Sequence, residues 1–189
     1  MSSQNISRLL SAITNAERME FFEKWGVIRN EQEYLAVDIT SISSYSELIG
    51  DIEWGYNRDK EHLAQINVCM LLGENSRLPV FQTTYSGSLK DVSTLKTTLQ
   101  LSSGLKLRNL SLVMDKGFCS KNNINAMLDD KEGIRFLIAM PFTMAFARNQ
   151  TDRERKDIDS IDNTIVVGED IIRGTTQKCS WSSKHSFVL

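Results

Sequence analysis

This sequence has few cysteines, no long apolar run and no excess of positive charge, and each of these absences excludes a class of protein. The three cysteines, Cys69, Cys119 and Cys179, are odd in number and widely spaced, so they form neither a zinc pattern nor a disulfide framework. This usage favours a reducing, cytoplasmic setting. No apolar run approaches the roughly 18 residues that a membrane helix needs, and the N-terminus is polar. We therefore expect no membrane span and no signal peptide.

The charge balance excludes a strongly basic protein. The sequence has 22 Lys and Arg against 24 Asp and Glu, a formal net charge of −2. Binding to DNA phosphates needs clustered Lys and Arg, so the charge alone indicates weak DNA binding, or a DNA-binding module outside this chain. The 189 residues, 41% of them hydrophobic, suffice for one globular domain, or one domain plus a fragment, with a sizeable core.

Short apolar runs between turn residues predict a mixed α/β fold. We expect strands at residues 34–39, 64–72, 78–85, 109–114 and 135–140, and helices that begin at Asp91 and after Ser120. The short turn at residues 73–76 predicts an antiparallel hairpin between the second and third strands. The order β-β-β-α-β-α-β predicts a five-stranded mixed sheet with helices on both faces.

The two ends of the chain differ from this central part. Apolar positions within residues 1–33 suit one or two amphipathic helices, either a helical hairpin packed on the core or the tail of a DNA-binding region. Residues 34–142 hold the predicted core. In residues 143–189, the charged segment 148–156 indicates a solvated stretch or a short helix, and the short β-prone runs after it are expected to lack partners.

Two aspartates, Asp38 and Asp115, each stand at the polar end of an apolar run. The simplest interpretation is that each one ends a strand and starts a turn, which is a common place for aspartate. The alternative is a shared metal site, because carboxylates on neighbouring strands are close enough to hold divalent cations that clamp a phosphodiester. The strand pattern alone leaves both interpretations open.

An ordered series of motifs between about Tyr34 and Phe142 resembles a known family. The segments are Asp38-Ile-Thr-Ser-Ile-Ser-Ser-Tyr, Trp54-Gly-Tyr-Asn-Arg-Asp-Lys60, Gln65-Ile-Asn-Val, Leu78-Pro-Val, Ser86-Gly-Ser, Asp91-Val-Ser-Thr-Leu95 and Val113-Met-Asp115-Lys-Gly-Phe118-Cys-Ser120. This series resembles the catalytic domain of bacterial insertion-sequence DDE transposases, in the group whose ribonuclease-H-like core is interrupted by a β-rich insertion.

The resemblance implies a fold, a site and a reaction. It implies a ribonuclease-H-like sheet in which the first and fourth strands are parallel neighbours, which brings Asp38 and Asp115 together. These two residues match the first two catalytic acids of the family, which hold Mg²⁺ or Mn²⁺ for cleavage and strand transfer of DNA. The third acid of the family lies in a Tyr-x-x-Arg-x-x-x-Glu pattern, which this sequence does not contain.

Aromatic and basic residues form a second candidate site. Bases stack on aromatic side chains while cationic ones hold phosphates, and such residues alternate in one segment, which contains Trp54, Tyr56, Asn57, Arg58 and Lys60. An exposed hairpin with an aromatic anchor is the competing interpretation. Lys116 and Lys121 flank the turn after Asp115, where they either meet phosphates or balance nearby acidic residues.

Three functions remain open from the sequence. The first is a transposase catalytic-domain fragment, truncated before the catalytic glutamate and inactive alone, with element ends and target DNA as partners. The second is a non-catalytic inhibitor or remnant that binds intact transposase, DNA or a second copy of itself. The third is an unrelated metal-dependent phosphatase, suggested by Asp38-x-Thr40 but disfavoured because that chemistry wants a second aspartate where Thr40 stands.

Overall fold

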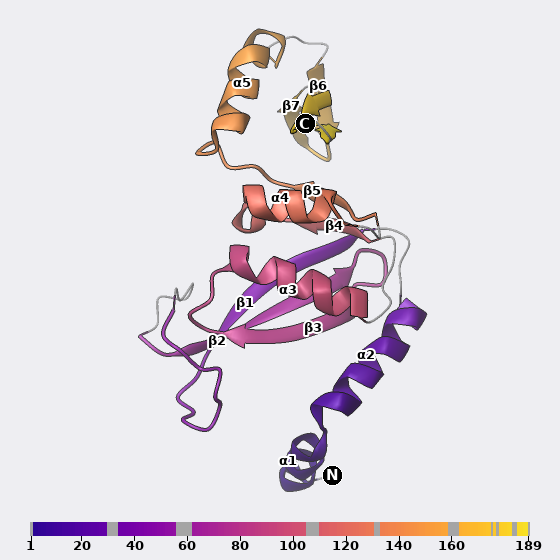
Figure 1. The fold of residues 1–189 in the computed structure, drawn as a ribbon, viewed down its shortest axis with the longest axis vertical. Helices are drawn as coiled ribbons and strands as arrows, with labels where there is room; N and C mark the ends of the chain where they lie inside the picture. The colour runs from indigo at the N-terminus through magenta and orange to yellow at the C-terminus, as the bar shows by residue number, and fades with distance from the viewer. Residues whose placement is uncertain are drawn as a thin grey trace. The chain divides into compact units, whose positions relative to one another are not determined.

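The fold is known from a computed structural model (Figure 1). It describes residues 2–29, 34–55, 62–104, 110–130, 133–158, 163–174, 176, 178–182 and 185–188. The chain divides into two compact units, residues 1–139 and residues 140–189, and each is described by itself below. The domain boundaries expected from the sequence, after residues 33 and 142, stay predictions.

A five-stranded mixed sheet forms the centre of the first unit, in the order β3-β2-β1-β4-β5. Strands β1, β2 and β3 are antiparallel neighbours, whereas β1 and β4, and β4 and β5, are parallel. This arrangement confirms the predicted ribonuclease-H-like sheet and the hairpin. The strands are β1 (Leu35–Ser43), β2 (Gln65–Gly73), β3 (Pro79–Ser86), β4 (Ser111–Met114) and β5 (Arg135–Ile138).

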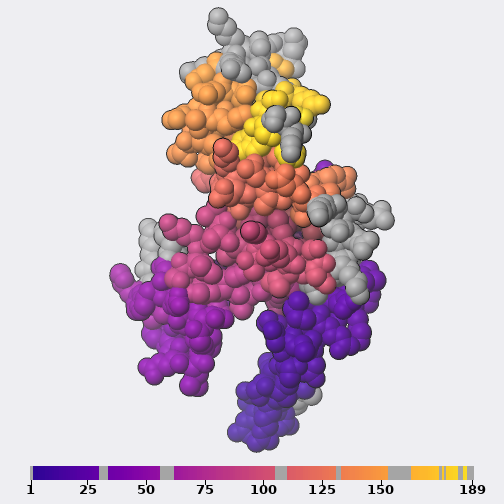
Figure 2. All heavy atoms as spheres, in the orientation of Figure 1, coloured from indigo at the N-terminus to yellow at the C-terminus, as the bar shows by residue number. Residues whose placement is uncertain are grey.

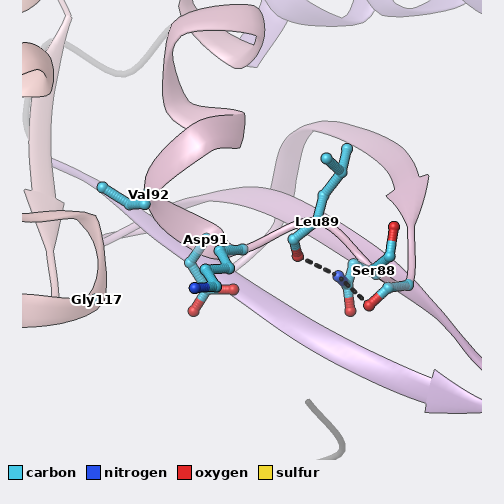
Figure 3. A pocket seen from close by; sticks show the side chains of 8 residues that line it. Ser88, Leu89, Asp91, Val92 and Gly117 are labelled. Carbon is cyan, nitrogen blue, oxygen red and sulfur yellow. Dashed lines mark hydrogen bonds between the residues drawn. The ribbon is translucent and has the colours of Figure 1, made fainter. Parts of the chain in front are cut away.

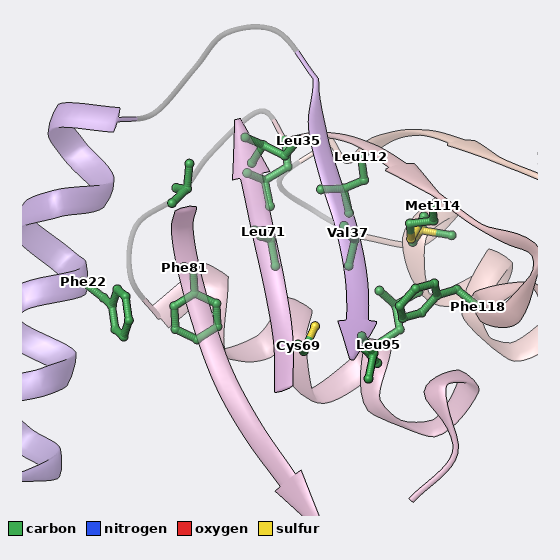
Figure 4. Close-up of a cluster of buried hydrophobic side chains, with 14 residues drawn as sticks. Phe22, Leu35, Val37, Cys69, Leu71, Phe81, Leu95, Leu112, Met114 and Phe118 are labelled. Carbon is green, nitrogen blue, oxygen red and sulfur yellow. The ribbon is translucent and has the colours of Figure 1, made fainter. Parts of the chain in front are cut away.

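One face of this sheet carries the core (Figure 4). Residues alternate across a strand, so Leu35, Val37 and Ile39 of β1 are buried while the residues between them, Asp38 among them, are exposed. The same alternation buries Cys69 and Leu71 of β2, which pair with Ile39 and Val37. Burial of this apolar face is the main force that holds the sheet to its helices.

Helices of the first unit cover this core face of the sheet. From α2 (Asn15–Arg29), Phe22 packs edge-on against Phe81 of β3 with ring centroids 5.1 Å apart. From α3 (Asp91–Gly104), Thr98 contacts Cys69, and Met127 of α4 (Lys121–Leu128) joins the same core cluster.

The expected second layer of helices is therefore not found in the described part of residues 1–139. The connections from β3 to β4 and from β4 to β5 run across the sheet in the same direction. Because such crossovers are right-handed, they place α3 and α4 on the same side. The opposite face of β1 keeps exposed side chains, and Asp38 is one of them.

The N-terminal segment forms two helices, α1 (Ser3–Ala12) and α2, as the apolar spacing predicts. A capping box separates them: the Thr14 hydroxyl accepts from the Glu17 N–H at 3.2 Å, and the Glu17 carboxylate accepts from the Thr14 N–H at 2.8 Å. No residue of α1 is buried, and its side chains lie on the surface (Figure 2). The predicted packing of this segment on the core is therefore right for α2 and wrong for α1.

The second unit contains one helix and two hairpins. The charged segment was expected to be a solvated stretch or a short helix, and it lies within the helix α5 (Ala145–Ile158). The strands are β6 (Thr164–Val167), β7 (Asp170–Arg173), β8 (Lys178–Ser180) and β9 (Ser186–Val188). The expectation that the following β-prone runs lack partners is wrong, because β6 pairs with β7 and β8 pairs with β9 in two antiparallel hairpins. Within the described ranges of both units, no helix is long and apolar enough to cross a membrane.

Candidate active site

The pairing of β1 with β4 ends one step before Asp38 and Asp115. Every paired position in these two strands differs by 77 residue numbers, and Asp38 and Asp115 are the next two residues in this register. Neighbouring strands lie about 4.8 Å apart, so the backbones that lead to the two aspartates run close together. The observed pairs are Leu35 with Leu112, Ala36 with Val113, and Val37 with Met114.

Each aspartate is held by a different local structure. Asp38 lies within β1, and its flanking residues Val37 and Ile39 point into the core, which turns its own side chain to the uncovered face. Asp115 follows the last residue of β4 and caps the short 3-10 helix η1 (Lys116–Phe118), where its Oδ1 accepts from the Gly117 N–H at 2.8 Å. Buried Phe118 fixes the far end of this turn to the core.

A third carboxylate, that of Asp91, lies close to this turn at Gly117 (Figure 3). A Cβ atom on Gly117 would lie 2.9 Å from Oδ1 of Asp115 and 3.3 Å from Oδ2 of Asp91, the first residue of α3. The two oxygens therefore approach the same point from two elements, and a side chain at position 117 would push against both. The sequence marks Asp91 only as the start of a helix.

The negative charges of Asp38 and Asp91 also act on the buried thiol of Cys69. Burial raises the pKa of Cys69 most strongly, and the charges of Asp38 and Asp91 raise it further, while a hydrogen bond from Thr98 lowers it. Like charges disfavour formation of a thiolate, so the thiol of Cys69 stays protonated. Cys69 is fully buried, which makes it a core residue as the sequence indicates.

The donor set fits a hard divalent cation. In the parts of the chain that the structure describes, no group of three or more His, Cys, Asp or Glu side chains is arranged to hold a metal ion. Mg²⁺ keeps several water ligands and is commonly bound through one or two carboxylates together with substrate phosphates. The exposed carboxylates of Asp38 and Asp115 meet that smaller requirement.

The predicted DNA-binding residues separate into two places. Lys116 begins η1 and Lys121 begins α4, and both exposed side chains flank the turn after Asp115. Trp54 is 68% exposed and lies in the segment that approaches the loop after β3. The other predicted residues of that segment lie outside the described residues: Tyr56, Asn57, Arg58 and Lys60.

A carboxylate that the sequence did not single out anchors the Trp54 segment. Glu53 pairs with Gln65 through two backbone hydrogen bonds of 3.0 and 2.9 Å, and its carboxylate accepts from the hydroxyls of Ser86 and Ser88. These hydrogen bonds, that of Ser86 first, lower the pKa of Glu53. A Cβ on the next glycine, Gly55, would lie 1.8 Å from the Gly87 carbonyl oxygen, so the two backbones touch.

Two buried asparagines have a structural role that the sequence did not predict. Asn67 is 3% exposed, and its amide donates to the carbonyls of Leu89 at 2.9 Å and Ser86 at 3.2 Å. Asn123 is 5% exposed, and its amide donates to the carbonyls of Val92 and Phe118, both at 2.8 Å. For Asn67 a signal existed, because a polar residue at a core-facing position of a strand needs buried hydrogen-bond partners.

Comparison with known proteins gives a matching family and two similar solved structures. The family described as "Transposase DDE domain" matches residues 29–179. Among solved structures, the chain is similar to the piggyBac transposase in a synaptic complex with hairpin DNA, at 13% identity and a TM-score of 0.46, covering 78% of this chain and 28% of that one. It is also similar to the Mos1 transposase in a paired-end complex with the left transposon end, at 10% identity and a TM-score of 0.37.

The Mos1 comparison covers 78% of this chain and 57% of the other, so this chain spans less than two thirds of either transposase. Among curated proteins, no sequence matches it. The family match alone extends over more than half of the 189 residues, and it includes β1 and β4 with both aspartates. The chain therefore belongs to the DDE transposase family.

Proposed function

We propose that Asp38 and Asp115 hold the divalent metal with which this chain takes part in the cleavage and joining of DNA. The observation that carries the proposal is the register of β1 and β4, which ends with Val37 opposite Met114, so that the next residues of the two segments are Asp38 and Asp115. Members of the DDE transposase family generally use a divalent metal for these reactions. A pair of strand-ending turns alone would not require both residues to share one level of the sheet.

The residues around the two aspartates have separate tasks in this proposal. Asp38 and Asp115 would supply oxygen ligands to Mg²⁺ or Mn²⁺, which when bound activates the attacking oxygen and stabilises the leaving one. The N–H of Gly117 holds one carboxylate oxygen of Asp115, which fixes its direction. Lys116 and Lys121 offer positive charge to the phosphates on either side of the turn.

Calorimetric titration with Mn²⁺ tests the metal site. We expect weak binding to the 189-residue chain that is lost in Asp38→Asn and in Asp115→Asn. The matched control is Asp152→Asn, which removes an exposed carboxylate of α5 and leaves the binding unchanged. Micromolar or tighter binding that survives Asp38→Asn would place the metal elsewhere and contradict the proposal.

We further propose that this chain belongs to the insertion-sequence group of transposases and does not cleave or join DNA by itself. Asp38 and Asp115 provide fewer ligands than the three acids of the family pattern. The assay incubates the purified chain and supercoiled plasmid with Mn²⁺, and we expect no nicking. Nicking that disappears in both Asp38→Ala and Asp115→Ala would show that the 189 residues already contain a complete site.

The partners follow from the same chemistry. We propose that the chain contacts DNA at element ends and target, and that the intact transposase or a second copy supplies what this chain does not. Sedimentation of the chain with and without DNA separates these states. A second copy that joins only when DNA is present would support assembly on the DNA, whereas a dimer without DNA would support direct association.

A further inference from the structure

Strands β6 and β7 form a hairpin (Figure 1) that exposes apolar side chains on both of its faces. Val166 pairs with Ile171 on one face, and Ile165 pairs with Ile172 on the other. A contiguous exposed apolar surface is typical of an interaction site, and a lone two-stranded hairpin is only marginally stable in water. These properties indicate that the hairpin binds a partner. Its five large aliphatic side chains are between 49% and 72% exposed: Ile165, Val166, Val167, Ile171 and Ile172.

The outer edge of β7 has backbone groups available for a further strand. Among the described residues, no strand pairs with this edge. Successive residues of a strand point their N–H and C=O groups to alternate edges. The N–H of Gly174 donates to the Asn163 carbonyl at 2.9 Å, so the backbone groups of every second residue, Ile172 and Asp170, face β6. The N–H and C=O groups of Ile171 and Arg173 therefore lie on the outer edge, in the row that pairs with an added strand.

The charges along β7 are self-complementary, which favours a second copy of the same strand as the partner. Glu169 lies two residues before Ile171 and Arg173 two residues after it, so an acid and a base flank this isoleucine at equal spacing. When two β7 strands pair in antiparallel fashion about Ile171, the two isoleucines lie opposite each other. Arg173 then lies opposite Glu169 of the second copy, and the two-fold symmetry repeats this pair at the other end.

Registers centred on the neighbouring residues are excluded. The backbone groups of Asp170 and Ile172 face β6, so neither residue is the centre. A pair centred on Glu169 or on Arg173 sets two like charges directly opposite each other, which destabilises a sheet. Within residues 169–173, the register about Ile171 is therefore the one that the backbone and the charges both allow.

We propose that β7 binds β7 of a second copy of this chain in antiparallel register about Ile171, which joins the two hairpins into one four-stranded sheet. Val166 and Ile171 of both copies then form a row of four aliphatic side chains on one face. The guanidinium of Arg173 has five N–H donors, so it binds the carboxylate of the second copy in addition to its contacts within its own chain. The inference rests on the proposed function only in taking a second copy as the partner, and it involves neither the metal site nor DNA.

Sedimentation equilibrium of the full 189-residue chain, in EDTA and without DNA, tests the association. The paired edge is short compared with a standard protein interface, so we expect a weak dimer whose fraction rises between about 10 μM and about 1 mM protein. A chain that stays monomeric over this whole range would overturn the proposal.

Charge reversal tests the register. Glu169→Arg sets two arginines opposite each other at both ends of the pair, and Arg173→Glu sets two glutamates there. Because two attractive pairs become repulsive, we expect each variant to weaken the dimer at least about tenfold. In an equal mixture of the two variants every pair is again opposite in charge, so the mixture dimerises within about threefold of the original affinity. Asp152→Arg, which makes the same change of charge at an exposed position of α5, leaves the dimer unchanged.

Two outcomes of this experiment would overturn the proposal. One is a dimer that keeps its affinity in both single variants, which would place the second copy on another surface. The other is a mixture that stays monomeric. A hairpin that fails to fold in a variant does not restore dimerisation on mixing, so recovery in the mixture shows that both variants are folded.

Proline substitutions locate the contact on one edge of the hairpin. Ile171→Pro removes an N–H on the outer edge of β7 and leaves the hydrogen bonds to β6 in place, and we expect the dimer to be lost. The matched control, Val166→Pro, removes an N–H on the outer edge of β6 and keeps the dimer. Loss in Val166→Pro but not in Ile171→Pro would overturn the proposal. A dimer that persists in Asp38→Asn supports the hairpin contact whatever the Mn²⁺ titration shows, so the two proposals fail separately.

Discussion

Replacing Asn123 with leucine tests how the turn after Asp115 is held in place. The buried amide of Asn123 donates to the carbonyls of Val92 and Phe118 at 2.8 Å each, which joins the start of α3 to this turn. Leucine has a similar size but no donor, so both hydrogen bonds are lost. The Val92 carbonyl lies within α3 and keeps its helical hydrogen bond, whereas the Phe118 carbonyl loses the partner that Asn123 provides. A lost hydrogen bond costs about 0.5–1.5 kcal/mol and a buried polar group left without a partner about 1–3 kcal/mol, so we expect a loss of about 2–4 kcal/mol in the free energy of unfolding.

Urea denaturation followed by circular dichroism measures this loss. With a slope of about 2 kcal/mol per molar urea, the midpoint falls by about 1–2 M. The control, Asn122→Leu, changes the exposed neighbouring residue of α4, and we expect it to stay within about 0.5 kcal/mol of the original protein. If Asn123→Leu is as stable as this control, the two hydrogen bonds do not hold the turn, and the reasoning is refuted.

Two further predictions concern the same region. Hydrogen bonds from Ser86 and Ser88 lower the pKa of Glu53, so the contact they form is complete above the ordinary carboxyl pKa and is lost as the pH falls through the lowered value. Nuclear magnetic resonance titration of Glu53 checks this, and a Ser86→Ala, Ser88→Ala double variant that leaves the pKa unchanged would contradict it. In Gly117→Ala, the new Cβ meets Oδ1 of Asp115 at 2.9 Å, and we expect the affinity for Mn²⁺ to fall at least about tenfold. Gly50→Ala, whose Cβ meets nothing within 4 Å, keeps the affinity, and an unchanged affinity in Gly117→Ala would contradict the expectation.

Local pattern was enough to predict the strands of the core and the order in which they occur. The alternation of Leu35, Val37 and Ile39 with exposed residues is a property of a strand with one buried face, and it appears in the sequence before any folding is considered. Ser120 caps α4, as its position before an apolar face predicts, with its hydroxyl accepting from the Asn123 N–H at 3.1 Å. That β1 and β4 are parallel neighbours was expected from the resemblance to a family.

Two other features were not predicted correctly. The β-prone runs after Ile158 form two hairpins, β6 with β7 and β8 with β9, because in each hairpin a short turn brings the second strand back beside the first. Helix α1 has the apolar spacing of a packed helix and yet buries no residue, since spacing shows which face is apolar but not whether a surface exists to receive it.

The sequence by itself determined which residues face the core and that two apolar runs end in aspartates, because side-chain periodicity and turn chemistry act over a few residues. Only the tertiary structure decided what surrounds those aspartates. It places α3 beside the turn so that Asp91 approaches Gly117. It also buries Asn67 and Asn123, whose amides donate hydrogen bonds to the carbonyls of Leu89 and Val92. The physical reason is that hydrogen bonds and packing join residues 19 to 31 positions apart, such as Asn67 with Ser86 and Asn123 with Val92, and no local pattern specifies such partners.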